Sequence, residues 1–234
     1  MSGVTSGGDP DVFKRYAIYY TAQGAFAQRG AAWLGWDVDQ GKAVPHPKLA
    51  ALDIAALTES PRKYGFHGTL KAPFRLAKGT DEAGLQNAVA TLANQIQSVE
   101  VEGLKVTALG RFLALTPQGD GTAIKELAAQ VVEGLDSFRA PFHPDEFAQR
   151  RKSYLSSVQE TNLLQWGFPH VMEQFRFHMT LTSRMPRGEL TQVQQAVENL
   201  FEPVLPRPFR IDALTLLGQR ADDMFVTLKR YPLS

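Results

Sequence analysis

The chain contains no cysteine among its 234 residues. It therefore has no disulfide bonds and no thiol chemistry, which is compatible with a reducing cytoplasm, the location we expect. No apolar run approaches the roughly 18 residues that a membrane-spanning helix requires, so no membrane association is expected. The formal net charge is only +1, which argues against a protein that coats nucleic acid by general electrostatic attraction.

The composition otherwise fits a globular enzyme. Hydrophobic residues make up 44% of the chain and include 14 Phe, enough to bury one large core or two small ones. Residues 1–11 are polar and rich in Gly and Ser, without the basic start and apolar stretch of a signal peptide, and we predict that they are disordered. No linker marks a boundary after them, so residues 12–234 are predicted to form one domain.

Histidine is also scarce, yet two of the five His share one local pattern. Each has a Thr two residues later and lies within an apolar frame, as Phe66-His67-Gly68-Thr69-Leu70 and Phe177-His178-Met179-Thr180-Leu181. Paired imidazoles presented with hydroxyls are suited to moving protons around a phosphate. A single His on a strand is most often a surface residue or a satisfied, partly buried one, but the duplication favours a functional pair.

Both patterns have the period of a β-strand. In the second copy, His178 and Thr180 alternate with buried-type residues, so the two polar side chains are predicted to share one face. The first copy, a strand over about 65–73, has the same parity and places His67, Thr69 and Lys71 together.

A zinc site is a weaker interpretation of the same residues. The sequence has neither His-x-His nor a His-Glu-x-x-His helix, and Thr and Lys are poor zinc ligands. We therefore expect no metal and no other cofactor.

The paired His-x-Thr strands resemble the 2H phosphoesterase superfamily, which is named for its two histidines. The string Tyr64-Gly-Phe-His-Gly-Thr-Leu-Lys-Ala-Pro-Phe74, with Arg15-Tyr-Ala-Ile-Tyr19 and Ala32-Trp-Leu-Gly-Trp36, resembles a branch encoded in bacterial phosphonate-utilisation operons. The resemblance extends from about residue 13 to the C-terminus. Gly68 departs from it, because many relatives carry a larger residue there, and a Gly in a strand permits close approach of a ligand or of another backbone.

The resemblance implies an α+β fold with two lobes related by a pseudo-twofold axis. Each lobe would carry an antiparallel sheet with helices outside, and a central cleft would lie between the lobes. We place the lobe of the first motif at about 65–137 and that of the second at about 174–234.

The hydrophobic pattern predicts an order of elements that fits such a duplication. After the first motif come a helix over 80–97 with Thr80 as its N-cap, strands over 101–109 and 111–116, and a helix over 122–137. After the second come a helix over 189–201 and strands over 208–217 and 223–230. Before the first motif we expect a strand over 16–21 and a helix over 24–36, with Trp33 and Trp36 in the core. Residues 139–173 are interrupted by Pro, helical around 145–165, and form either a cover for the cleft or a plain surface excursion.

The predicted chemistry is acid–base catalysis without a metal. One neutral His would take a proton from water as the water attacks phosphorus, and the other, protonated, would donate to the leaving oxygen. Thr69 and Thr180 would donate hydrogen bonds to the non-bridging oxygens, and Lys71 would add positive charge there. Which His is the base stays open.

The phosphonate-operon resemblance suggests a phosphorylated sugar cyclic phosphate, 5-phosphoribosyl 1,2-cyclic phosphate, as the substrate. The sequence does not define the oligomeric state, and we expect a monomer. Basic residues flank both motifs and suit a second phosphate. An alternative substrate is an RNA end with a 2′,3′-cyclic phosphate, on whose bases Tyr19, Tyr64 and Trp166 would stack. Arg15 shares the strand parity of Tyr19 and is a further candidate binding residue. A third possibility is a phosphate- or nucleotide-binding module without catalysis.

Overall fold

Antiparallel strands form the centre of the structure, a computed structural model that describes residues 13–49, 52–143, 145–147, 151 and 154–234. In this part of the chain, seven strands form one sheet in the order β11-β10-β1-β4-β8-β7-β6, and the neighbours are antiparallel. They are β1 (Arg15–Thr21), β4 (His67–Phe74), β6 (Gly103–Leu109), β7 (Phe112–Gln118), β8 (Met179–Thr180), β10 (Ala213–Gln219) and β11 (Phe225–Pro232). Residues 1–11, which we predicted to be disordered, lie outside the described residues.

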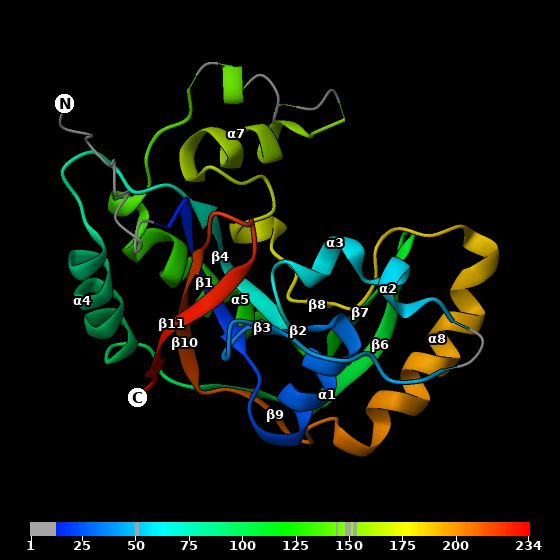
Figure 1. Cartoon of the computed structure of the whole chain (residues 1–234). Helices are drawn as coiled ribbons and strands as arrows, with labels where there is room; N and C mark the ends of the chain where they lie inside the picture. Colours follow the sequence, from blue (N-terminus) through cyan, green and yellow to red (C-terminus); the bar gives the residue numbers. More distant parts are fainter. Residues whose placement is uncertain (1–12, 50–51, 144, 148–150, 152–153) are drawn as a thin grey trace, which may run out of the picture.

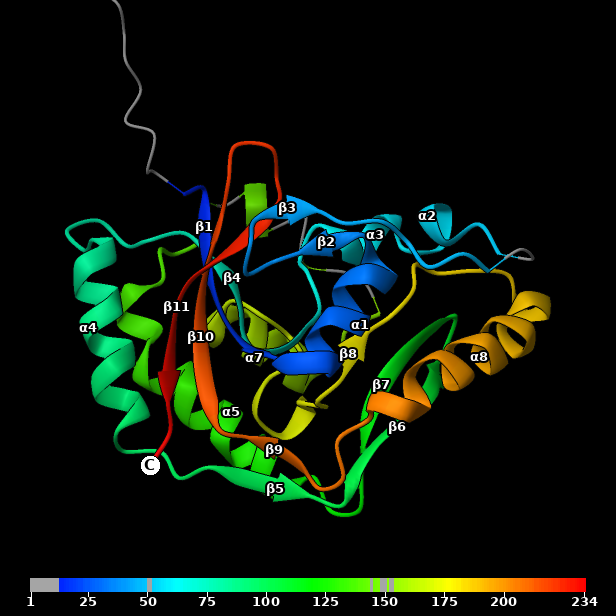
Figure 2. The same cartoon turned by 60° about the horizontal axis from the view of Figure 1, so that its bottom comes forward.

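Two further strand pairs and several helices surround this sheet (Figure 1). β2 (Trp36–Asp37) pairs with β3 (Lys42–Ala43), and β5 (Val99–Val101) pairs with β9 (Phe209–Ile211), which runs beside it in Figure 2. The α-helices with described bounds are α1 (Gly24–Leu34), α2 (Ile54–Leu57), α3 (Glu59–Arg62), α4 (Glu82–Ala93), α5 (Thr122–Gly134), α7 (Ser157–Trp166) and α8 (Arg187–Phe201). Short 3₁₀ helices are η1 (Asp136–Phe138), η2 (Met172–Gln174) and η3 (Glu202–Val204). The predicted α+β class with antiparallel strands is confirmed.

The two halves of the sheet meet where Gly68 of β4 pairs with Met179 of β8. On one side of this junction β4 pairs with β1, and the sheet continues to β10 and β11; on the other side β8 pairs with β7, and the sheet ends at β6. Each half therefore combines the strand of one motif with the hairpin that follows the other motif. The order of elements repeats as expected, but the lobes drawn at 65–137 and 174–234 do not coincide with the halves of the sheet, because the hairpins are exchanged.

Helices bury the outer face of both halves. α4 packs against β10 and β11, α5 against β4, and α8 against β6 and β7, and α4 and α8 lie at opposite ends of the molecule in Figures 1 and 2. Their apolar residues, among them Leu85, Val89, Val131, Val197 and Phe201, join one large core cluster. Among the described residues, no helix combines the length and the apolar character that a membrane span requires.

The start of α4 differs from the prediction by one residue. Asp81, not Thr80, is the N-cap, because its carboxylate accepts a 2.7 Å hydrogen bond from the backbone N–H of Gly84. The Thr80 hydroxyl instead donates to the carbonyl of Ala77 at 2.8 Å.

Helix α1 anchors the second motif. Trp33 and Trp36 are buried, as predicted, and the indole N–H of Trp33 donates a 2.7 Å hydrogen bond to the carbonyl of Leu181. The sheet ladder around this motif covers only β8, because Met179 alone pairs with both Gly68 of β4 and Leu115 of β7, and Thr180 pairs only with Ala114 of β7. Phe177, Met179 and Leu181 are nevertheless buried in alternation with His178 and Thr180, so the predicted parity is confirmed.

Gly68 gives space to a side chain, not to a ligand. A Cβ atom placed on Gly68 would lie 2.3 Å from Cζ of Phe177, whose ring fills the position beneath the strand. The ring is buried and packs near Tyr20 and Phe209 in the core, with centroid distances of 6.3 and 5.7 Å. The missing side chain therefore allows the second motif to pack closely against β4.

We expect Gly68→Ala to lower the free energy of unfolding by about 1–3 kcal/mol, because the methyl group overpacks the Phe177 ring. Urea unfolding measures this. Gly188→Ala is the matched control: it lies in the first turn of α8 with open space around it, and it should leave stability unchanged or raise it by about 0.5–1 kcal/mol. Equal stability of Gly68→Ala and the unaltered protein would contradict the close packing.

Candidate active site

The pairing of β4 with β8 brings the two motifs together. Because Gly68 lies opposite Met179 in an antiparallel pair, His67 lies beside Thr180 and Thr69 beside His178. Side chains directly opposed in this way have Cβ atoms about 4.5–5.5 Å apart. Met179 is fully buried on the core side, so the two His and the two Thr share the other face.

Both imidazoles are held in the same way. Nδ1 of His67 lies 2.9 Å from the carbonyl oxygen of Gly65, and Nδ1 of His178 lies 2.8 Å from that of Arg176. A carbonyl only accepts, so Nδ1 carries the proton in each neutral ring and Nε2 is left as the basic atom. The hydroxyl of Thr69 lies 3.1 Å from Nε2 of His67 and donates to it. The first motif thus presents a basic nitrogen in contact with a hydroxyl, and the second presents His178 on the same face as the hydroxyl of Thr180.

The first His has the more secluded environment. Its ring stacks on Tyr19 with centroids 3.8 Å apart and an interplanar angle of 24°. Burial lowers the pKa of His67 to about 4, with the hydrogen bond to Gly65 opposing the shift and the positive charge of His178 adding to it. His67 is therefore neutral at physiological pH in the unliganded protein.

A cavity of about 660 Å³ lies against the second His. Thr69 and His178 line it from the strands, and Phe112 from β7 lies 6.1 Å from the His178 ring. The remaining wall includes Gln159, Phe168 and His170, which belong to the segment over 139–173. For the described part of that segment, the structure therefore supports a cover for the cavity over a plain surface excursion. Residues 145–147 and Ser157–Trp166 are helical, and the rest of the predicted helical range lies partly outside the described residues.

Sequence reasoning missed these cavity residues. His170 is one of only five His, which is a weak signal, and nothing in the pattern around Gln159 or Phe168 separates a cavity wall from an ordinary surface. In the parts of the chain that the structure describes, no three His, Asp or Glu side chains are grouped closely enough to hold a metal ion.

Residues 69–226 match the family described as Protein of unknown function (DUF1045). The chain belongs to this family. Two curated relatives carry the name Ribose 1,5-bisphosphate phosphokinase PhnN: the protein of Janthinobacterium sp. (strain Marseille) is 34% identical over 94% of this chain, and that of Laribacter hongkongensis (strain HLHK9) is 31% identical over 83%. This chain covers 51% and 46% of their lengths, so it spans about half of the relatives that it matches.

Solved structures with a similar arrangement include E. coli LigT complexed with 3′-AMP, which matches over 95% of this chain and 99% of its own, with 14% identity and a TM-score of 0.47. TT0787 of Thermus thermophilus matches over 94% of this chain and 97% of its own, with 14% identity and a TM-score of 0.45.

In this DUF1045 protein, Tyr19 supports the site from below. It is only 1% exposed and its ring contacts His67, so the predicted role of stacking on a substrate base is wrong. Tyr64 is half-buried at the margin, with its ring centroid 6.0 Å from that of His67 and 5.3 Å from that of Phe225. Its predicted contact with substrate stays a prediction.

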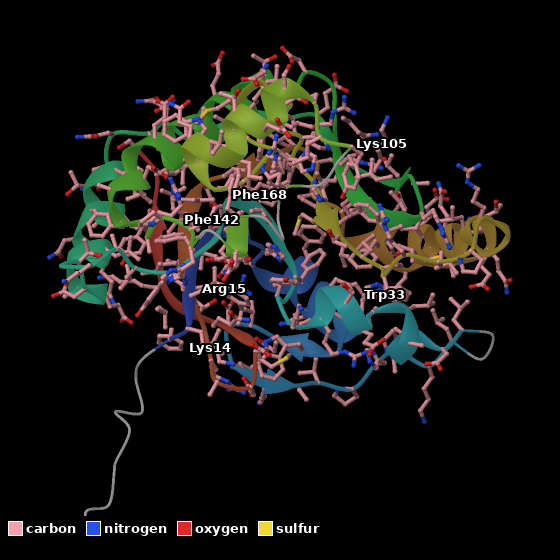
Figure 3. The ribbon with its side chains drawn as sticks, turned by 90° about the horizontal axis from the view of Figure 1, so that it is seen from above. Lys14, Arg15, Trp33, Lys105, Phe142 and Phe168 are labelled. Atoms are coloured by element: carbon pink, nitrogen blue, oxygen red, sulfur yellow. The ribbon has the colours of Figure 1, made fainter. Side chains whose placement is uncertain are left out.

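Arg15 and Trp166 line a second, narrower cavity next to the main one. Figure 3 shows Arg15 near Phe142 and Phe168, which line the same space. Nε of Arg15 donates a 2.7 Å hydrogen bond to Gln219. The predicted binding roles of Arg15 and Trp166 are untested by this arrangement.

Lys71 does not share the face of His67, contrary to the prediction. The pairing of β1 with β4 shifts register between Ile18, opposite Lys71, and Tyr19, opposite Thr69, so Leu70 is an extra residue. Such a bulge reverses the parity of the residues after it, and Lys71 turns toward α5. Nζ of Lys71 donates to the carbonyl of Val132 at 3.0 Å and pairs with Asp136 at 3.1 Å. Burial lowers the pKa of Lys71 to about 8.

We expect Asp136→Ala to lower the free energy of unfolding by about 3 kcal/mol, because Lys71, only 3% exposed, would keep a buried charge without its carboxylate. Lys71→Met should change stability by no more than about 1 kcal/mol, since Asp136 keeps its pair with Arg139. Urea unfolding of the two variants and of the double variant checks this. If Asp136→Ala is as stable as Lys71→Met, the pair has no structural role.

Proposed function

We propose that this chain is a phosphodiesterase of the 2H type that opens a cyclic phosphodiester by acid–base catalysis, without a metal ion. The observation that carries the proposal is the junction of β4 with β8, which sets two Nδ1-anchored imidazoles and two hydroxyls on one face. A positioned general acid or base typically contributes about 10²–10⁴ in rate. Cytoplasmic location and a monomeric state also remain predictions.

The surroundings of the two His favour different roles. His67, whose lowered pKa keeps it neutral, accepts the proton of the attacking water at Nε2. His178, at the cavity wall, donates its proton to the leaving oxygen as the P–O bond breaks. The water oxygen becomes the new phosphate oxygen, and the product is a phosphomonoester with a free hydroxyl. Thr180 donates to a non-bridging oxygen, where negative charge develops, and Thr69 does the same once its hydroxyl has turned from Nε2 of His67 to the bound substrate.

A phosphorylated sugar cyclic phosphate is the substrate that the relatives favour. Their name gives ribose 1,5-bisphosphate as the compound they phosphorylate. Hydrolysis of 5-phosphoribosyl 1,2-cyclic phosphate with cleavage of the bond between phosphorus and O2 yields ribose 1,5-bisphosphate. The proposed activity would therefore produce the compound that the relatives' name specifies.

An RNA or nucleotide 2′,3′-cyclic phosphate is the second candidate. The observation in its favour is the aromatic wall of the cavity, where Phe112, Phe168 and Phe175 present rings on which a base could stack. A module that binds such a ligand without turnover is the third candidate, and the presence of His and Thr in both motifs speaks against it.

Assays of the purified protein with both cyclic phosphates, in the presence of a chelator, test the proposal. We expect turnover with preference for the sugar substrate, and a loss of about 10²-fold or more in kcat for His67→Ala and for His178→Ala. A strong preference for oligonucleotides that end in a 2′,3′-cyclic phosphate would show that the second candidate, and not the sugar, is the substrate. Binding of either ligand without hydrolysis would establish the non-catalytic module, and full activity of either His variant would remove the mechanism.

The pH dependence should reveal the environment of His67. Because protonated His67 cannot accept a proton, kcat/KM should fall as the pH drops through about 4, well below the range near 6.5 expected for an ordinary His. Tyr19→Leu removes the stacked ring and should move this acid limb upward. NMR titration of His67 in the unliganded protein gives the same pKa directly, and a value near 6.5 would contradict the assignment.

A further inference from the structure

The cavity beside His178 has a third imidazole, which the proposed chemistry does not use. His170 is an exposed side chain that lines the cavity together with Thr69 and His178. Its ring lies edge-on to that of Phe168, with centroids 5.7 Å apart and an interplanar angle of 75°. His170 comes from the segment that covers the cleft, so it faces any molecule held between that cover and the strands.

A neighbouring glutamine determines which nitrogen of His170 carries the proton. Gln159 is the third residue of a capping box at the start of α7: its Oε1 accepts a 3.0 Å hydrogen bond from the backbone N–H of Ser156. Since Oε1 is engaged there, the amide nitrogen of Gln159 points the other way and lies 3.4 Å from Nδ1 of His170. The amide donates, so Nδ1 of His170 accepts and Nε2 carries the hydrogen.

His170 therefore has the opposite tautomer to the two motif imidazoles. In their neutral forms, His67 and His178 donate from Nδ1 to backbone carbonyls and leave Nε2 without a hydrogen, whereas neutral His170 carries its hydrogen on Nε2. Partial burial and the nearby positive charge of His178 both lower the pKa of His170, which favours this neutral form. A neutral donor at a cavity wall is suited to recognise an oxygen rather than to exchange protons with the reacting group.

We infer that His170, oriented by Gln159, is a substrate-binding residue that donates a hydrogen bond from Nε2 to an oxygen of the substrate outside the cyclic diester, either a sugar hydroxyl or an oxygen of a second phosphate. The inference rests on the proposed function, because it takes the phosphodiester to lie at His67 and His178. It adds a determinant of specificity that the two motifs do not contain, and it gives Gln159 and His170 a role in binding the substrate.

The test is a ratio of kcat/KM values. It compares 5-phosphoribosyl 1,2-cyclic phosphate, ribose 1,2-cyclic phosphate and ethylene phosphate, a cyclic diester with no further oxygen-bearing group. His170→Ala should lower the ratio of the best sugar substrate to ethylene phosphate by about tenfold, mainly through KM, as expected for one lost hydrogen bond. A fall confined to the 5-phosphorylated substrate identifies a phosphate oxygen; a fall for both sugars identifies a hydroxyl.

Three variants control the experiment. His143→Ala is the matched control, since His143 is an exposed His of the same segment that does not line the cavity. Gln159→Leu should also lower the ratio, by about threefold, because Nδ1 of His170 then has no donor and either ring nitrogen can carry the hydrogen. His170→Gln, which keeps an N–H donor, should recover part of the loss. An unchanged ratio in His170→Ala overturns the inference while leaving the proposed function intact.

If the unaltered protein hydrolyses none of the three esters, the proposed function fails and the inference is decided by binding. Calorimetry then compares the affinity of the unaltered protein, His170→Ala and His143→Ala for 5-phosphoribosyl 1,2-cyclic phosphate. A loss of about tenfold confined to His170→Ala supports the contact. Equal affinities, or no binding by the unaltered protein, overturn it.

Discussion

The contact between Gly68 and Met179 is the one on which the site depends. It joins the two halves of the sheet, and it is the reason that motifs far apart in the sequence share a face. The contact is reinforced from outside the ladder: the backbone N–H of Leu181 donates to the carbonyl of Leu113 at 2.9 Å, and the carbonyl of Leu181 accepts from the Trp33 indole. A junction with so short a ladder needs such support, because each hydrogen bond contributes only about 0.5–1.5 kcal/mol net.

Strand β1 makes the two motif imidazoles unequal. It lies between β10 and β4 in one half of the sheet, whereas β7 pairs directly with β8 in the other. Tyr19 of β1 therefore stacks under His67, while His178 faces a cavity and has Phe112 as its aromatic neighbour. Two identical His-x-Thr motifs thus have different surroundings, and the burial of His67 lowers its pKa to about 4 and keeps it neutral.

The sequence alone predicts those features of the site that depend only on neighbouring residues of one strand. The alternation of side chains over three residues places His67 with Thr69 and His178 with Thr180, and no bulge intervenes within either short span. The predicted position of Lys71 is wrong, because the bulge in β4 arises from its pairing with β1 and cannot be deduced from the residues of β4 alone. The same limit applies to the exchanged hairpins and to the cavity wall, since both depend on which elements meet in space and not on their order along the chain.

The exchange of hairpins bears on how such a fold can arise. Two copies of a short chain with one motif strand, one helix and one hairpin, each donating its hairpin to the other, would build the same central junction. The four polar side chains belong in equal parts to both units and meet only where the units join. An ancestral chain of that kind would have had no site as a monomer, and fusion of the two copies would have made the site independent of protein concentration.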